Sequence, residues 1–188
     1  MKLNRISPFF TASPQLSVAD VGLAASQGFK AIINNRPDGE ADQQPSSAEI
    51  EAAARAQGLD YRHVPVVGGK ISDADIAAFT EAMAQVNGPV LAYCRTGTRS
   101  TTLWALSEAR HMDADAIIAA AGEAGYDISG LKGRLSARLR RPSGASAAGS
   151  EAPGAPSERA FDVVIVGGGA GGLAAASSLL KRRRGLRI

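Results

Sequence analysis

Short apolar runs alternate along the chain with longer segments whose apolar positions recur at helical spacing. The apolar runs predict buried strands at residues 29–34, 59–67 and 89–93, the second of them interrupted by a proline. The intervening and following segments predict helices at residues 17–28, 46–58, 72–86, 100–110, 113–122 and 128–139. This order indicates an α/β fold with a central, mainly parallel sheet flanked by helices on both faces.

Three serines mark predicted beginnings of helices. Ser17, Ser46 and Ser72 each precede an acidic residue in the first helical turn, which is the composition of an N-terminal cap. Residues 5–16 lack such a signal, and we expect them to form an irregular extended start with Phe9-Phe10 as an anchor in the core.

The chain's single cysteine lies between the strand at 89–93 and the next helix. A thiol at Cys94 is therefore expected at a ring of backbone N–H groups and at the positive end of a helix dipole. Both features stabilise a thiolate, which suits a nucleophilic cysteine that handles an anion. Ligands of parallel sheets bind beyond the carboxyl ends of the strands. The loops at 36–38 and 68–70 should open on the same edge as Cys94.

Several neighbours of Cys94 are candidates for holding the anion. Arg99 is expected to close the loop and to pair with the anion through its fork of N–H donors. Arg95 has no predictable direction. The backbone N–H groups of the loop would form an anion nest, so the candidate anion-binding residues are Arg95, Thr96, Gly97, Thr98 and Ser100.

The last part of the chain, from residue 141 onward, differs in composition from the part before it. Residues 141–160 are almost all small or proline and predict a flexible linker after a first domain at 1–140. An apolar strand at 161–166 then precedes Gly167, Gly169 and Gly172, the G-x-G-x-x-G pattern of a dinucleotide-binding βα unit. The acid that holds the ribose should follow roughly 20 residues later, beyond Ile188. We expect 161–188 to be an incomplete Rossmann fragment, from truncation or a longer protein, that binds no cofactor stably. FAD is expected only in a complete domain.

Composition narrows the class of protein. The formal net charge is +3, and the basic excess of the last third carries no interleaved aromatic residues, which favours a solvated surface over a nucleic-acid site. No apolar run approaches the ~18–20 residues of a membrane span, and we see no secretory signal. One cysteine forms no internal disulfide, which fits a cytoplasmic location. The His, Cys and acidic residues show no metal-ligand spacing, so no metal is expected.

The spacing between Cys94 and Arg99 resembles that of a known loop. Four residues separate them, as in rhodanese sulfurtransferases, whereas protein tyrosine and dual-specificity phosphatases use five. The segments at 32–40, 61–66 and 90–100 together resemble the beta-lactamase-hydrolase-like family over roughly residues 1–112. That resemblance implies a dual-specificity-phosphatase-like fold. It also implies fusion to persulfide-processing domains or to flavin-dependent sulfide:quinone-type oxidoreductases, whose first βα unit the C-terminal fragment resembles.

These resemblances lead to three hypotheses. The first is a sulfurtransferase that forms a persulfide on Cys94, with a small anionic sulfur donor, a thiol acceptor and a flavoprotein as partner or fused domain. The second is a phosphatase of the dual-specificity type that forms a phosphocysteine. The third is a non-catalytic module that binds an anion or a partner.

The phosphatase hypothesis needs a general acid. The place where related phosphatases carry an Asp reads Val-Gly-Gly-Lys here, and Asp38 is the remaining candidate, which a turn role explains as well. The resemblance also implies that Ser100 or Thr98 donates a hydrogen bond to the cysteine sulfur. A plain helix N-cap explains Ser100 equally well.

Overall fold

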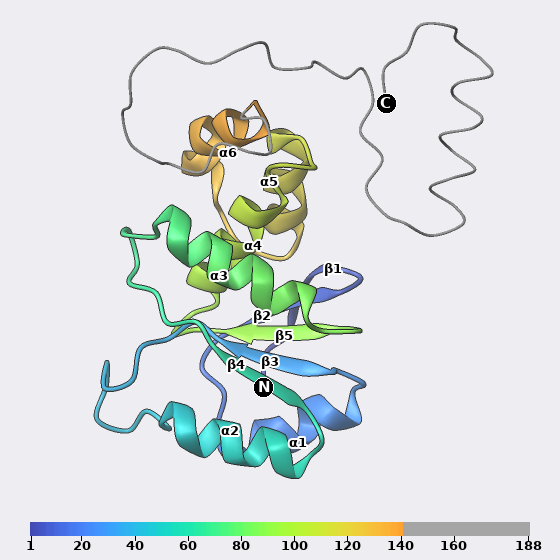
Figure 1. The fold of residues 1–188 in the computed structure, drawn as a ribbon, viewed down its shortest axis with the longest axis vertical. Coiled ribbons are helices and arrows are strands. Elements are labelled where there is room, and N and C mark those ends of the chain that lie inside the picture. The colour runs from blue at the N-terminus through green and yellow to red at the C-terminus, as the bar shows by residue number, and fades with distance from the viewer. Residues whose placement is uncertain (141–188) are drawn as a thin grey trace, which may run out of the picture. The chain divides into compact units, whose positions relative to one another are not determined.

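The computed structural model describes residues 1–140, which lie within the first of two units of the chain, Met1–Ala145. Its centre is a five-stranded sheet in the order β1-β2-β5-β3-β4 (Figure 1). β1 pairs antiparallel with β2, and the other neighbours pair in parallel. The strands are β1 (Asn4–Ser7), β2 (Phe10–Ser13), β3 (Ala31–Asn34), β4 (Asp60–His63) and β5 (Val90–Tyr93). The predicted α/β fold with a mainly parallel sheet is confirmed.

Helices cover both faces of this sheet. Figure 1 shows α1 and α2 on one face and α3 and α4 on the other, with α5 and α6 stacked beyond α4. The helices are α1 (Val18–Ser26), α2 (Ser47–Ala56), α3 (Asp73–Ala84), α4 (Thr98–Glu108), α5 (Ala114–Glu123) and α6 (Lys132–Leu139), with a short 3-10 helix, η1 (Ser129–Leu131), before α6. No helix within residues 1–140 is both long and apolar enough to cross a bilayer.

The three predicted serine caps are present. Ser17, Ser46 and Ser72 each accept a hydrogen bond from the backbone N–H three residues on, and the carboxylate of the acid at that position accepts one from the serine's own backbone N–H. These reciprocal capping boxes satisfy donors that the first helical turn leaves unpaired. The serines therefore fix where α1, α2 and α3 begin.

Side-chain alternation along β5 divides the core into two clusters. Val90 and Ala92 pack with α3 to α6, whereas Leu91 and Tyr93 pack with α1 and α2. Successive strand residues point to opposite faces of a sheet, so a strand that is apolar at every position is buried on both sides. All four residues of β5 are buried, as the continuous apolar run predicts.

Residues 5–16 differ from the expectation of an irregular start. They contain most of the β1–β2 pair, with Asn4 opposite Ala12 and a register shift between Arg5 and Ser7. Phe10 is buried as expected, but Phe9 is 64% exposed. Thr11 and Ser13 of β2 are polar although they are buried. The sequence of β2 therefore lacks the continuous apolar run by which the other buried strands were predicted.

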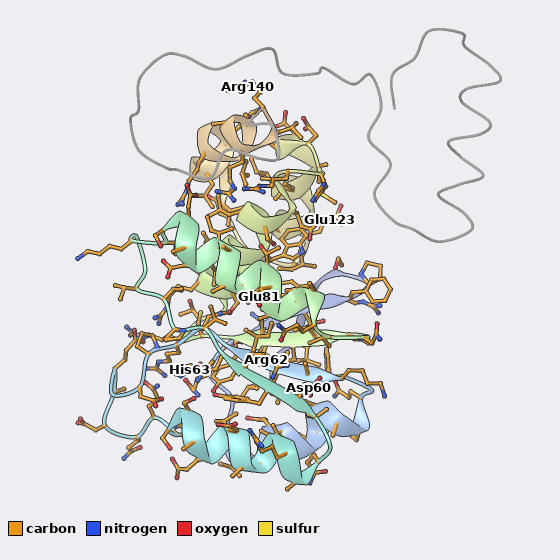
Figure 2. All side chains as sticks on the ribbon, viewed as in Figure 1. Asp60, Arg62, His63, Glu81, Glu123 and Arg140 are labelled. Carbon is orange, nitrogen blue, oxygen red and sulfur yellow. The ribbon has the colours of Figure 1, made fainter. Side chains whose placement is uncertain are left out.

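The carboxyl ends of the parallel strands meet at one edge. Asn34 at the end of β3 lies opposite both Tyr93 of β5 and His63 of β4, and Ser13 of β2 also lies opposite Tyr93. Figure 2 shows His63 at the end of β4 from which the chain leaves for α3, and Asp60 at the other end. The predicted linker at 141–160 and the glycine motif at 167–172 lie outside the described residues.

Candidate active site

Cys94 lies directly beyond the last residue of β5 and is fully buried. Its backbone N–H donates to the carbonyl of Ser13 at 3.4 Å, which continues the β2–β5 pairing by one residue. Its Sγ accepts a hydrogen bond from the backbone N–H of Gly97 at 3.1 Å. The cysteine sulfur therefore faces at least one backbone N–H of the turn.

Gly97 is required at the beginning of α4 for two reasons. It is the N-cap residue, with a φ of 91° in the left-handed region that favours glycine. A Cβ added at this position would lie 1.9 Å from the hydroxyl oxygen of Tyr126. The glycine therefore permits both the turn that returns an N–H to Cys94 and the close packing of an aromatic ring behind that turn.

Tyr126 connects the C-terminal part of the described chain to the cysteine loop. Its hydroxyl accepts from Asn4 Nδ2 at 2.6 Å and donates to the carbonyl of Thr96 at 3.4 Å. Burial raises the pKa of Tyr126, the hydrogen bond from Asn4 opposes that rise, and the charge of Cys94 adds to it. Residues of β1 and of the segment after α5 thus help to hold the loop.

Arg99 lies in the first turn of α4 and is anchored by two groups from other loops. Its Nη1 and Nη2 donate to Oε1 and Oε2 of Glu40, both at 2.7 Å, and Nη1 also donates to the carbonyl of Val66 at 2.9 Å. The pKa of Arg99 is raised, mainly by the hydrogen bonds to Glu40 and further by Cys94. The Glu40 carboxylate and the Val66 carbonyl therefore fix the direction of the guanidinium, and the pairing of Arg99 with an anion stays a prediction.

Glu40 joins two arginines. Besides Arg99, it accepts from Arg36 Nε at 2.9 Å, and Arg36 Nη1 in turn donates to Gln15 Oε1 at 2.8 Å. The hydrogen bonds from Arg99, followed by those from Arg36, lower the pKa of Glu40 from 4.5 to about 2 despite some opposing burial. No pattern in the sequence singled out Glu40, although it lies on the loop that was expected to open beside Cys94.

Asp38 is engaged at the beginning of α2. Its Oδ1 accepts the backbone N–H of Ser47 at 2.8 Å, which satisfies one of the unpaired donors of that helix. Asp38 is exposed, and it lies on the same loop as Glu40. The structure gives it the turn role that the sequence allowed, and its role as a general acid stays a prediction.

The remaining loop residues divide into exposed and buried groups. Arg95, Thr96 and Thr98 are exposed, and the two threonine hydroxyls lie 3.1 Å apart. Ser100 is fully buried, and its Oγ has no hydrogen-bond partner among residues 1–140. The N-cap interpretation of Ser100 is wrong, because α4 begins at Thr98 and Gly97 is its cap. The expected hydrogen bond from Ser100 to the cysteine sulfur is absent among the described residues, where the sulfur accepts from the Gly97 N–H instead.

The site is a cysteine–arginine loop without a metal cluster in the described region. Over residues 1–140, no group of three His, Cys, Asp or Glu side chains gathers as a metal ion would require. What the loop offers an anion is the Gly97 N–H beside the thiol and the guanidinium of Arg99. This arrangement can bind a small oxyanion next to a sulfur nucleophile.

Known proteins share this sequence and fold. A Beta-lactamase hydrolase-like protein of Agrobacterium fabrum (strain C58) is 48% identical over 109 residues, which are 58% of this chain and 25% of that relative. The chain thus matches about a quarter of the length of that curated relative. The crystal structure of a "putative phosphatase" from Neisseria meningitidis Z2491 is 37% identical, with a TM-score of 0.67, over 73% of this chain and 99% of that one.

A more distant structure shares the fold alone. The catalytic core of a PP-IP phosphatase from Saccharomyces cerevisiae is 17% identical, with a TM-score of 0.54, over 71% of this chain and 82% of that one. The family model described as Beta-lactamase hydrolase-like protein, phosphatase-like domain, matches residues 2–111, which include β1 to β5, Glu40 and the whole cysteine loop. By this match, the chain belongs to the Beta-lactamase hydrolase-like protein family through its phosphatase-like domain.

Proposed function

We propose that the chain is a cysteine-dependent phosphatase that forms a phosphocysteine on Cys94. The observation that carries this proposal is the placement of Arg99, which Glu40 and the Val66 carbonyl hold beside the buried thiol. A planar guanidinium fixed in direction matches the oxygens of a phosphoryl group through paired N–H donors. The phosphatase-like family domain and the 37% identical Neisseria structure support the same reaction class.

The reaction divides into two displacements at phosphorus. The Cys94 thiol first loses its proton to solvent, and its sulfur then attacks phosphorus as the bond to the leaving oxygen breaks. A water molecule next attacks the phosphocysteine, the P–S bond breaks, and the electron pair returns to sulfur while the water's proton goes to solvent. Arg99 and the N–H groups of the loop stabilise the phosphoryl oxygens throughout, which is the main way in which proteins assist phosphoryl transfer.

Sulfur transfer, the first hypothesis from the sequence, becomes the second candidate. The matched family domain and the two compared structures carry phosphatase names, and none of the compared proteins supports a sulfurtransferase. One observation still favours it, namely the four-residue spacing between Cys94 and Arg99, which resembles the rhodanese loop. In this reaction the sulfur of Cys94 would accept a sulfane sulfur from an anionic donor.

Two assays on the full 188-residue chain separate these functions. Release of phosphate from p-nitrophenyl phosphate that Cys94→Ser abolishes supports the phosphatase. Thiocyanate formation from thiosulfate and cyanide, lost in the same variant, supports the sulfurtransferase instead. If wild type and Cys94→Ser behave alike in both assays, the catalytic proposal fails and the non-catalytic module gains. Circular dichroism of both proteins verifies that the substitution leaves the fold intact.

A further inference from the structure

Two acidic side chains of the loop between β3 and α2 accept hydrogen bonds within the protein, which competes with a role as proton donor. Both oxygens of Glu40 accept from Arg99, and one also accepts from Arg36, so this carboxylate is held as an anion. Asp38 accepts the Ser47 N–H at the beginning of α2. Asp42, the third acid of this loop, is exposed.

The loop between β4 and α3 approaches Arg99 from the other side with backbone and glycine. Its Val66 carbonyl accepts from Arg99 Nη1, and a Cβ added at Gly68 would lie 4.0 Å from Arg99 Cδ. Between residues 64 and 72, Lys70 is the one residue with an ionisable side chain, and that side chain is exposed. Gly68, where an added Cβ would approach Arg99, therefore offers the arginine no side chain.

The histidine at this edge also has its proton engaged. His63 Nε2 lies 3.1 Å from the carbonyl oxygen of Arg36, so this nitrogen donates to the backbone. A general acid must reach the leaving oxygen with a free proton. Glu40 uses both of its oxygens, and Asp38 and His63 each use one polar atom, in contacts that hold the loops of the site in place.

We propose that this site transfers phosphoryl groups from leaving groups that depart as anions, namely phosphoanhydrides, acyl phosphates and acidic aryl phosphates, and selects against alkyl phosphates. The proposal rests on the phosphatase function proposed above. As the Cys94 sulfur bonds to phosphorus, the P–O bond breaks and its electron pair leaves on the oxygen without a proton. An alkoxide is too basic to leave in this way, whereas a carboxylate, phosphate or phenolate is stable in water.

The size of the effect follows from general acid catalysis, which contributes about 10²–10⁴-fold to a rate. Without that contribution, the rate depends strongly on the pKa of the leaving alcohol. We expect kcat/KM to fall by roughly three- to tenfold for every unit rise of that pKa. An enzyme with a positioned acid shows a much flatter dependence, because the proton compensates for a poor leaving group.

The test uses the full chain with a series of substituted phenyl phosphates, acetyl phosphate and an alkyl phosphate such as phosphoserine. The expected result is a steep decline of kcat/KM along the phenyl series, rapid turnover of acetyl phosphate and negligible turnover of phosphoserine. Equal Cys94-dependent rates on phenyl phosphates of low and high leaving-group pKa would overturn the inference.

The Cys94→Ser variant, measured on the same substrates, gives the turnover that does not depend on the thiol. Different results would reject the proposed substrate class and the proposed phosphatase function. Loss of all Cys94-dependent turnover rejects the phosphatase, whereas a flat slope with Cys94-dependent turnover rejects only the substrate class.

Discussion

The guanidinium of Arg99 and the carboxylate of Glu40 form a two-pronged ion pair, with both N···O distances at 2.7 Å, across 59 residues of sequence. The pair joins the first turn of α4 to the loop between β3 and α2, and Arg36 extends it to Gln15. A paired guanidinium loses little freedom when an anion binds, since its direction is already set. The geometry of the anion site thus depends on a residue remote from the cysteine loop.

Removing either partner of this pair should lower catalysis in a non-additive way. Arg99→Lys replaces the fork by a single ammonium, and we expect kcat/KM for p-nitrophenyl phosphate to fall by about 10²–10³-fold. Glu40→Gln leaves the arginine without its anionic anchor and should cost on the order of tenfold. The double variant should be no worse than Arg99→Lys, because Glu40 acts through Arg99.

The surface ion pair between Arg55 and Glu51 on α2 provides matched controls. Arg55→Lys and Glu51→Gln make the same chemical changes on the outside of α2, and both should keep wild-type kinetics. Full additivity of Glu40→Gln and Arg99→Lys would show that Glu40 does not act by positioning the guanidinium.

The same ion pair should make stability depend on acid pH. The folded-state pKa of Glu40 is about 2, against 4.5 ordinarily. A lowered pKa contributes stability that is fully present above pH 4.5 and is lost as the pH falls through about 2. Urea midpoints should show a wild-type advantage over Glu40→Gln that is constant at neutral pH and shrinks below pH 4.5. An advantage that persists unchanged at pH 2 would contradict this account of Glu40.

The close packing behind the cysteine loop predicts a cost for any side chain at position 97. Gly97→Ala introduces strain at a φ of 91° and a clash with Tyr126, and we expect it to lower the free energy of unfolding by roughly 1–3 kcal/mol. Tyr126→Phe in the same chain should recover part of that loss, since it removes the nearest atom. Urea denaturation measures both changes.

A second glycine provides a control that distinguishes the clash at position 97 from the general effect of replacing a glycine by alanine. Gly22 lies in α1 with no heavy atom within 4 Å of an added Cβ. Gly22→Ala should stabilise the protein by about 0.5–1 kcal/mol, because alanine loses less conformational freedom in a helix. Equal stability losses at both positions would show that the clash with Tyr126 is not responsible.

The contact of Asp38 with Ser47 predicts a structural effect of its substitution. Asp38→Ala removes the acceptor for the first N–H of α2 and should cost about 1 kcal/mol of unfolding free energy. Asp38→Asn retains an acceptor oxygen, so stability and kcat should both stay close to wild type. A kcat reduced by about 10²-fold in Asp38→Asn, with loss of the alkaline limb of the pH profile, would instead identify Asp38 as the general acid.

Local signals in the sequence predicted most of the scaffold. The helices α1, α2 and α3 begin where the serine–acid pairs place them, because a capping box is completed within four residues. The apolar run at 89–93 predicted β5, which is buried on both faces. The β1–β2 hairpin escaped notice because it depends on pairing with β5 more than on its own apolar pattern.

The cysteine loop was recognisable, but its supports were not. The spacing from Cys94 to Arg99 indicated an activated thiol at an anion site, and the structure brings the two together. Glu40 and Tyr126 reach this loop from 59 and 30 residues away in the sequence, and no local periodicity reports contacts of that range. The loop spacing, the missing acid after Val66 and the flavoprotein-like glycine motif together led toward sulfur transfer, whereas the family domain and the Neisseria structure favour phosphatase chemistry.

The most direct test of the phosphatase account is a single-turnover reaction of the full chain with p-nitrophenyl phosphate, quenched and examined by mass spectrometry. The account predicts that the peptide containing Cys94 gains the mass of one phosphoryl group at the rate at which p-nitrophenol is released, and that Cys94→Ser shows neither event. Equal release of p-nitrophenol by wild type and Cys94→Ser, with no adduct on Cys94, would contradict it.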